Sequence, residues 1–209
     1  MSRQRLTQEQ RKQETRKLLL ESAFETFAKL GFHGASVDKI AEHAGFSKGA
    51  VYAHFHTKEE LFLAIVDRQM HIYVQDICNM IEKEQSLESF IETIDQYSHS
   101  IRQKTKTWNM LTMEFLLYAM REESVRDKWA NMIDDTVEQI SKSIENFIQN
   151  ADYQATLSAK EIAWTILSLE NGISIFYNIS QQHMPMNLYK KALQNMLLSF
   201  DESYIRKTL

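Results

Sequence analysis

Hydrophobic residues recur along most of the chain at the three-and-four spacing that is typical of amphipathic helices. In the first such segment, over residues 9–30, five apolar side chains share one helical face: Leu20, Ala23, Phe24, Phe27 and Ala28. No segment shows the sustained alternation of apolar and polar positions that marks a half-buried strand. The pattern therefore predicts an all-α protein of about nine helices.

Glycines and serines predict where the first helices begin and end. Gly31 ends the first helix and Gly45 ends a short second one, since glycine suits the left-handed residue that follows a helix. Ser36 and Ser47 can each accept a hydrogen bond from the free amides of a first helical turn. The second helix is thus expected to follow Ser36, and a third to follow Ser47 and reach about His56.

A longer fourth helix is expected to begin at Thr57. The run from Thr57 to Glu60 has the sequence of a capping box, in which the two side chains satisfy each other's backbone amides. Apolar residues then keep helical phase to about Lys83. Further helices are predicted at about 86–103, 107–121, 123–150, 158–182 and 187–205.

Composition agrees with a helical protein. The chain has one proline and five glycines, and four of the glycines fall between residues 31 and 49, so chain reversals gather near the N-terminus. No apolar run approaches the roughly 18 residues needed to cross a bilayer, and the N-terminus lacks the apolar core of a secretory signal. These two features lead us to expect a cytoplasmic protein, and the lone cysteine, which cannot form an internal disulfide, fits a reducing compartment.

Charge divides the chain into two parts of opposite sign. Residues 1–58 hold ten Lys and Arg against six Asp and Glu, a net charge of +4, whereas residues 59–209 carry −8. A basic module can meet nucleic-acid phosphates while an acidic body stays soluble and repels the duplex. We therefore predict two domains, 1–58 and 59–209, of which the first binds DNA.

The segment from Ser36 to Phe55 has the layout of a helix-turn-helix. In that motif the N-terminal end of the second helix enters the major groove, so the residues there are small or form hydrogen bonds. Four residues meet this demand: Ser47, Lys48, Gly49 and Ala50. The side chains of Tyr52, His54 and Lys58 then offer polar or cationic tips that suit phosphate oxygens.

At these residues the chain resembles the TetR family of one-component bacterial transcriptional repressors. The resemblance rests above all on Gly45, Gly49, the Tyr52-x-His54-Phe55 element and Lys58. It covers about a quarter of the chain. Ala53 departs from the family pattern, since relatives often carry an aromatic or polar residue there.

The resemblance implies an all-α fold with an N-terminal helix-turn-helix domain and a C-terminal domain for ligand sensing and dimerisation. It implies a homodimer that binds a palindromic operator in double-stranded DNA and is released by a small apolar or amphipathic effector. A repressor is expected, and activator behaviour stays open. The implied DNA contacts are Ser36, Val37, Ser47, Lys48, Gly49, Ala50, Tyr52, His54 and Lys58. The long fourth helix is expected to couple the effector site to the DNA-binding domain.

A run from Trp108 to Met120 is too apolar all round for a one-sided surface helix, so we expect both of its faces to be covered. Core packing is one explanation, and an effector cavity is the other, because methionine and aromatic side chains make adaptable walls. Glu114 would either pair with a cationic ligand there or lie solvated at the helix edge. The candidate pocket residues are Trp108, Met110, Met113, Glu114, Phe115, Tyr118, Trp129, Met132, Trp164, Phe176 and Tyr177.

Two apolar stripes near the C-terminus are candidates for the dimer interface, because one chain does not obviously bury both. In the family the last two helices form a four-helix interface, where Gly172 would permit close approach of two backbones. The candidate interface residues are Ile162, Ile166, Leu169, Gly172, Ile173, Leu193, Met196, Leu197 and Phe200.

Two other classes of protein fit the sequence less well. A helical-bundle enzyme would need inward Glu-x-x-His pairs or a nucleophile with a base, and the chain contains no Glu-x-x-His, so we expect neither enzymatic activity nor a cofactor. His54 and His56 are not expected to bind metal, because residues two apart on a helix point apart. A helical adaptor that binds proteins but not DNA remains the second alternative.

Overall fold

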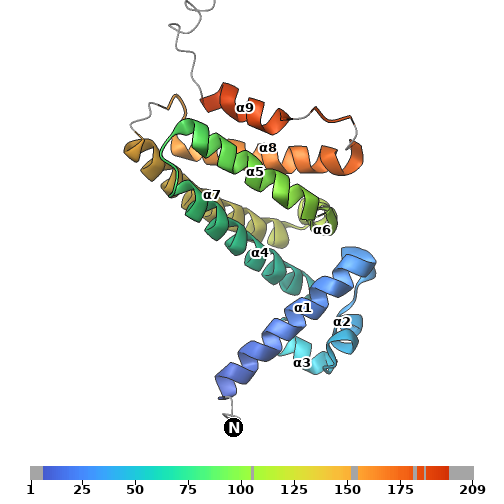
Figure 1. The fold of residues 1–209 in the computed structure, drawn as a ribbon. Helices are drawn as coiled ribbons and strands as arrows, with labels where there is room; N and C mark the ends of the chain where they lie inside the picture. The colour runs from blue at the N-terminus through green and yellow to red at the C-terminus, as the bar shows by residue number, and fades with distance from the viewer. Residues whose placement is uncertain (1–6, 105, 152–154, 181–182, 186, 198–209) are drawn as a thin grey trace, which may run out of the picture. The chain divides into compact units, whose positions relative to one another are not determined.

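The computed structural model of the chain describes residues 7–104, 106–151, 155–180, 183–185 and 187–197 (Figure 1). All regular secondary structure in these segments is helical, so the predicted all-α fold is confirmed. The helices are α1 (Gln8–Gly34), α2 (Val37–Ala44), α3 (Lys48–Tyr52), α4 (Lys58–Ile81), α5 (Leu87–Lys104), α6 (Lys106–Ala119), α7 (Glu123–Asn150), α8 (Ala159–Ser180) and α9 (Leu188–Leu197).

Packing divides the chain into two compact units. The first unit comprises Met1–Gln69 and Met110–Ala130, and the second comprises Met70–Asn109 and Asn131–Leu209. Helices α4, α6 and α7 each contribute residues to both units. The predicted helix-turn-helix therefore shares its compact unit with most of α6 and the start of α7. The functional boundary after residue 58 stays a prediction.

The first helix begins at a capping box and bends at Gly31. Thr7 Oγ1 accepts a hydrogen bond from Gln10 N (3.2 Å), and Gln10 Oε1 accepts one from Thr7 N (2.9 Å). Gly31 has a φ of +72°, a left-handed value that favours glycine, and helical structure resumes beyond it as far as Gly34. The predicted end of the helix at Gly31 is therefore a kink.

Two charged side chains hold the backbone after this kink. Glu114 of α6 accepts hydrogen bonds from the N–H groups of Phe32 (3.0 Å) and His33 (3.0 Å), one on each carboxylate oxygen. Lys58, at the start of α4, donates to the carbonyl oxygens of Phe32 (2.9 Å) and Ala35 (3.2 Å). Because both interactions involve a charged group, they are stronger than ordinary hydrogen bonds, and they fix the chain between α1 and α2.

The two short helices have the caps that the sequence predicts. Ser36 Oγ accepts from Lys39 N (3.3 Å), Ser47 Oγ accepts from Ala50 N (3.1 Å), and Gly45 ends α2 in a left-handed conformation. However, α3 ends at Tyr52 rather than near the predicted His56. Residues 53–57 connect α3 to α4, and His56 already takes part in the hydrogen bonds at the start of α4.

The start of α4 differs from the predicted capping box by one residue. Thr57 Oγ1 accepts from Glu60 N (3.0 Å), as expected. The Glu60 carboxylate accepts from His56 N (2.8 Å) instead of from the amide of Thr57. The second predicted box is confirmed, since Ser158 N donates to Glu161 Oε2 (2.8 Å) and Glu161 N to Ser158 Oγ (3.3 Å).

Aromatic rings from four helices form the core of the first unit. Phe62 of α4 stacks on Phe115 of α6, with ring centroids 4.2 Å apart. Phe32 packs edge-on against Phe115 at 4.8 Å, and Trp129 of α7 stacks on the same ring at 5.3 Å. Phe115 is completely buried in this cluster. Rings this close leave no room for a ligand between them, so core packing explains Phe115 and Trp129 better than the predicted cavity does.

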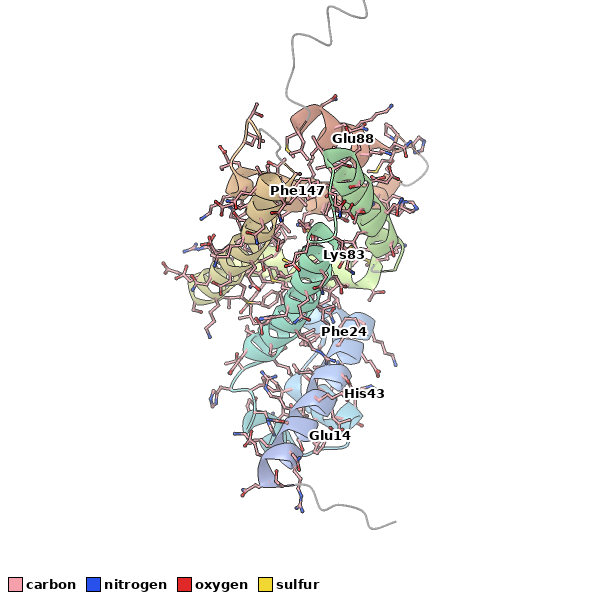
Figure 2. All side chains as sticks on the ribbon, turned by 60° about the vertical axis from the view of Figure 1, so that its left-hand side comes forward. Glu14, Phe24, His43, Lys83, Glu88 and Phe147 are labelled. Carbon is pink, nitrogen blue, oxygen red and sulfur yellow. The ribbon has the colours of Figure 1, made fainter. Side chains whose placement is uncertain are left out.

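Aliphatic side chains dominate the core of the second unit, where residues of α4, α5, α7, α8 and α9 pack together. Phe147 of α7, labelled in Figure 2, stacks on Phe90 of α5 with ring centroids 4.8 Å apart. Ile166 of α8 and Leu193 of α9 are both fully buried here.

Among the described residues, no helix combines the length and the apolar character that crossing a membrane requires.

Candidate nucleic-acid interface

The N-terminal end of α3 is an open surface. Ser47, Lys48 and Gly49 are exposed and Ala50 is half-buried. A Cβ added at Gly49 would meet only Ser47 Oγ, at an ordinary contact distance of 3.8 Å. Val51, one turn on, is buried and anchors the helix to its unit. The four residues predicted to face bases therefore share one short, accessible helix end.

The other predicted contacts flank this end of α3. Tyr52 is 41% exposed and His54 is half-buried, whereas Ser36 and Val37, at the start of α2, are half-buried. The Ser36 hydroxyl caps α2, so one of its lone pairs is in use while its proton can still be donated to a phosphate.

Lys48 is paired within the chain. Its ammonium group donates to the Asp38 carboxylate of α2 at 2.8 Å, and both side chains are exposed. The hydrogen bond and the charge of Asp38 raise the pKa of Lys48 above its ordinary value, so the lysine is charged at neutral pH. A phosphate that approaches Lys48 would therefore compete with Asp38 for its ammonium group.

Two cations of α1, Lys12 and Arg16, also lie near His54, although the sequence does not predict them as DNA contacts. Burial lowers the pKa of His54, and the positive charges of Lys12 and Arg16 lower it further. The Arg16 guanidinium also lies over the Phe55 ring, 4.9 Å from its centroid. Lys12 and Arg16 are four residues apart and so share one face of α1, which was the only signal in the sequence. Together with His54 they form a basic group that suits a phosphate.

Lys58 differs from these cations because it is already engaged. Besides its two carbonyl partners, its ammonium nitrogen lies 4.3 Å from the centroid of the Phe32 ring. These contacts brace the start of α4 against the end of α1. The contact of Lys58 with a phosphate, which the sequence predicts, stays a prediction.

The eleven candidate pocket residues are spread over both units. Phe115 and Trp129 lie in the aromatic core, and both oxygens of Glu114 accept backbone hydrogen bonds, which argues against a ligand partner for this carboxylate. Three residues are exposed: Met110, Trp164 and Phe176. The remaining five are half-buried: Trp108, Met113, Tyr118, Met132 and Tyr177.

The candidate dimer residues need a correction. A single chain does bury both C-terminal stripes, because α8 and α9 pack with α4, α5 and α7, and five of the predicted interface residues lie in that core: Ile162, Ile166, Ile173, Leu193 and Leu197. Leu169, Gly172 and Met196 are half-buried, and Phe200 lies outside the described residues. The exposed apolar side chains of α8 are instead Trp164, Phe176 and Ile179.

The described segments contain no group of three or more His, Cys, Asp or Glu side chains placed as metal ligands would be. The arrangement offers nucleic-acid contacts: a small-residue helix end, an exposed tyrosine, and cations from α1 and α3.

The chain also matches known proteins in sequence. Residues 19–65 match the family model described as bacterial regulatory proteins, tetR family. The chain is 32% identical over 111 residues to the HTH-type transcriptional regulator TtgW of Pseudomonas putida, which is 53% of this chain and 78% of TtgW. It is 26% identical over 155 residues to YfiR of Bacillus subtilis, covering 74% of this chain and 76% of YfiR.

The fold is also similar to that of a solved regulator. The structure of FadR from Bacillus subtilis in complex with stearoyl-CoA superposes with a TM-score of 0.68 over 88% of this chain and 97% of FadR. Sequence identity in that alignment is 16%, so the likeness concerns the fold alone.

Proposed function

Because the chain belongs to the TetR family of bacterial regulatory proteins, we propose that this DNA-binding transcriptional regulator is a cytoplasmic homodimeric repressor. It binds a palindromic operator and leaves it when a small amphipathic effector enters the second unit. Two recognition helices engage two half-sites only when their separation matches the operator, so an effector that favours another separation weakens binding.

The N-terminal end of α3 carries this proposal. Its exposed Ser47, Lys48 and Gly49, with Ala50 behind them, face the bases of the major groove. Tyr52, His54, Ser36 and Val37 flank it toward the phosphates, and Lys12 and Arg16 extend the phosphate contacts onto α1.

The exposed side of α8 is the proposed dimer interface. Phe176 is 63% exposed and Ile179, one helical turn on, is 78% exposed, so two large apolar side chains lie together on the surface of α8. A Cβ built at Gly172 would meet nothing within 4 Å, so a second backbone can approach there. A symmetric pairing of α8 with its copy would bury these side chains.

The effector remains a class rather than a compound. The similar FadR structure holds stearoyl-CoA, an amphipathic molecule with a long apolar chain. We propose that an amphipathic effector acts here too, bound among the helices of the second unit.

A gel-shift assay with the DNA upstream of the protein's own gene tests the regulator against the adaptor. The proposal predicts a discrete complex whose affinity falls steeply with salt, because cations of the protein displace counterions from the phosphates. Absence of salt-sensitive binding would favour the adaptor. A transcription assay on the same DNA separates a repressor, which lowers transcript yield, from an activator, which raises it.

A further inference from the structure

An ion pair lies buried in the second unit. Arg102 of α5 and Glu170 of α8 are 7% and 8% exposed, and Arg102 Nη1 donates to Glu170 Oε2 at 3.2 Å. The hydroxyls of Ser98 and Ser174 donate to the same carboxylate, the second at 2.9 Å to Oε1. The guanidinium carbon lies 5.5 Å from the centroid of the Tyr189 ring of α9. Three helices therefore meet at one polar cluster inside an otherwise aliphatic core.

A buried ion pair of this kind contributes little to the stability of the fold. Removing two charges from water costs several kcal/mol per ion, and well-packed apolar residues in their place are often as stable or more so. Burial raises the pKa of the Glu170 carboxyl despite the neighbouring arginine, so the desolvation of the carboxylate is only partly offset. A role in binding would account for a cluster that stability alone does not require.

Glu170 and Arg102 differ in how many of their hydrogen-bonding groups have a partner. Both Glu170 oxygens accept hydrogen bonds, from Ser98 and Arg102 on Oε2 and from Ser174 on Oε1. Among the described residues, the hydrogen bonds of the Arg102 guanidinium all come from Nη1. A guanidinium has five N–H donors in a fixed fork, and those of Nε and Nη2 meet no acceptor that the described residues supply. What the described part of the cluster can offer a ligand is therefore a donor.

The side chains around the Arg102–Glu170 cluster indicate which kind of ligand would fit there. Buried apolar residues lie one turn from the polar ones, with Ile94 before Ser98 and Ile166 before Glu170, so an apolar chain would find apolar neighbours. Other groups facing the cluster are Asp95 and the hydroxyls of Tyr73, Tyr97 and Tyr189, whose pKa values are raised by burial and by nearby carboxylates. These tyrosines are neutral. The Tyr97 hydroxyl already donates to Asp76 Oδ2 at 3.2 Å, whereas those of Tyr73 and Tyr189 can donate to a ligand.

We propose that Arg102 is the anion-binding residue of the effector site and that the effector is a small organic carboxylate with an apolar chain. This inference rests on the proposed function, since it names the chemical class of the effector. The carboxylate takes the free side of the guanidinium fork in a bidentate contact, and the chain packs against the aliphatic residues around it. Glu170 takes up a proton as the second negative charge arrives, which its already raised pKa favours.

The first experiment uses the full-length protein with hexanoate and octanoate as probes and with hexanamide and octanamide as neutral controls of the same length. Operator binding is measured first without any probe. If the protein binds no operator, the proposed function is rejected. The proposed class of effector is then judged by thermal shift alone. With operator binding present, both readouts apply.

The expected result is a rise of about 5 °C in melting temperature with at least one carboxylate. The same carboxylate should lower operator affinity by about tenfold or more. The amide of equal length should do neither. No thermal shift with either carboxylate, or an equal shift with its amide, would overturn the assignment.

A double variant, Arg102→Met with Glu170→Gln, separates binding from structure. It removes both charges at similar volume, so we expect a melting temperature at or above that of the wild type and no response to octanoate. A persisting octanoate response would overturn the proposal. The matched control is Lys142→Met with Glu138→Gln, which removes an exposed ion pair of α7 and should leave the octanoate response intact.

A milder variant covers the case in which the double variant does not fold. Arg102→Lys keeps the positive charge but loses the planar fork, so octanoate should bind about tenfold more weakly, while any pairing with Glu170 can persist. Unchanged octanoate affinity in this variant would contradict a bidentate contact at Arg102.

Discussion

Single side chains around α3 set how much positive charge is free at the proposed DNA-binding surface. The exposed Lys48 is held by Asp38 at 2.8 Å, and the carboxylate of Asp38 lies on the surface that would approach phosphates. An exposed pair of this kind contributes little to stability. Its consequence is therefore expected in binding and not in folding.

The variant Asp38→Asn tests this consequence. Removal of the charge frees Lys48 and ends repulsion of phosphates, so operator affinity should rise by about three- to tenfold at low salt, and less at high salt. Fluorescence anisotropy with a labelled operator measures the change. Glu138→Gln is the control, since it removes an exposed carboxylate of α7 and should leave affinity unchanged. An Asp38→Asn protein that binds no better would show that Asp38 does not compete for Lys48.

His54 gives operator binding a dependence on pH. Its pKa is lowered in the free protein by burial and by the charges of Lys12 and Arg16, so the imidazole is mostly neutral at neutral pH. A phosphate beside this group would favour the protonated form and raise the pKa in the complex, so binding takes up a proton. Affinity should therefore increase as pH falls from about 8 to about 6. The slope should flatten in His54→Gln, and an equal slope in that variant would assign the effect elsewhere.

At the scale of elements, the chain between α1 and α2 is held by contacts that lie far apart in sequence. A Cβ built at Gly31 would lie 2.9 Å from Glu114 Oε2, so the glycine both permits the left-handed turn and makes space for the carboxylate. Glu114 is thus a positioning residue for the helix-turn-helix.

Replacing Glu114 by Gln should weaken this support. One side-chain oxygen becomes an NH2 group that faces a backbone N–H, which costs about 1–3 kcal/mol of unfolding free energy. We expect a lower melting temperature and weaker operator binding, since α2 loses part of its anchor. The exposed Glu122→Gln is a matched control that should change neither. A Glu114→Gln protein as stable as the wild type would deny the carboxylate this role.

The same elements show what the sequence could predict. The caps at Ser36, Gly45 and Ser47 depend on neighbours within a turn, so local pattern was enough to place α2 and α3. Glu114 contacts residues more than eighty positions away. No spacing rule carries that information, and so the sequence leaves Glu114 either paired with a ligand or solvated at the helix edge. Likewise, apolar stripes on α8 and α9 do not reveal whether they meet their own chain or a copy, and only the packing with α4, α5 and α7 shows which of their residues the chain itself buries.

At the scale of the whole molecule, the proposed binding of a palindromic operator requires two copies of the chain. The exposed side of α8 is the proposed contact, so Phe176→Glu would place a charge in the interface. Light scattering after size exclusion should then report a monomer, and operator affinity should fall by about 100-fold or more because only one half-site is held. Leu117→Glu, at another exposed apolar residue, on α6, is the control and should remain dimeric. A Phe176→Glu dimer would move the interface elsewhere.

Selection of bound duplexes from a pool of random sequences tests most directly whether the α3 end recognises DNA. We expect the full-length protein to enrich a twofold-symmetric site and the Gly49→Glu variant to enrich none. The added side chain has space in the folded chain, since its Cβ meets nothing closer than 3.8 Å, yet its carboxylate would lie against the groove. If the wild type enriches no sequence, or if Gly49→Glu enriches the same site, then the N-terminal end of α3 does not recognise DNA.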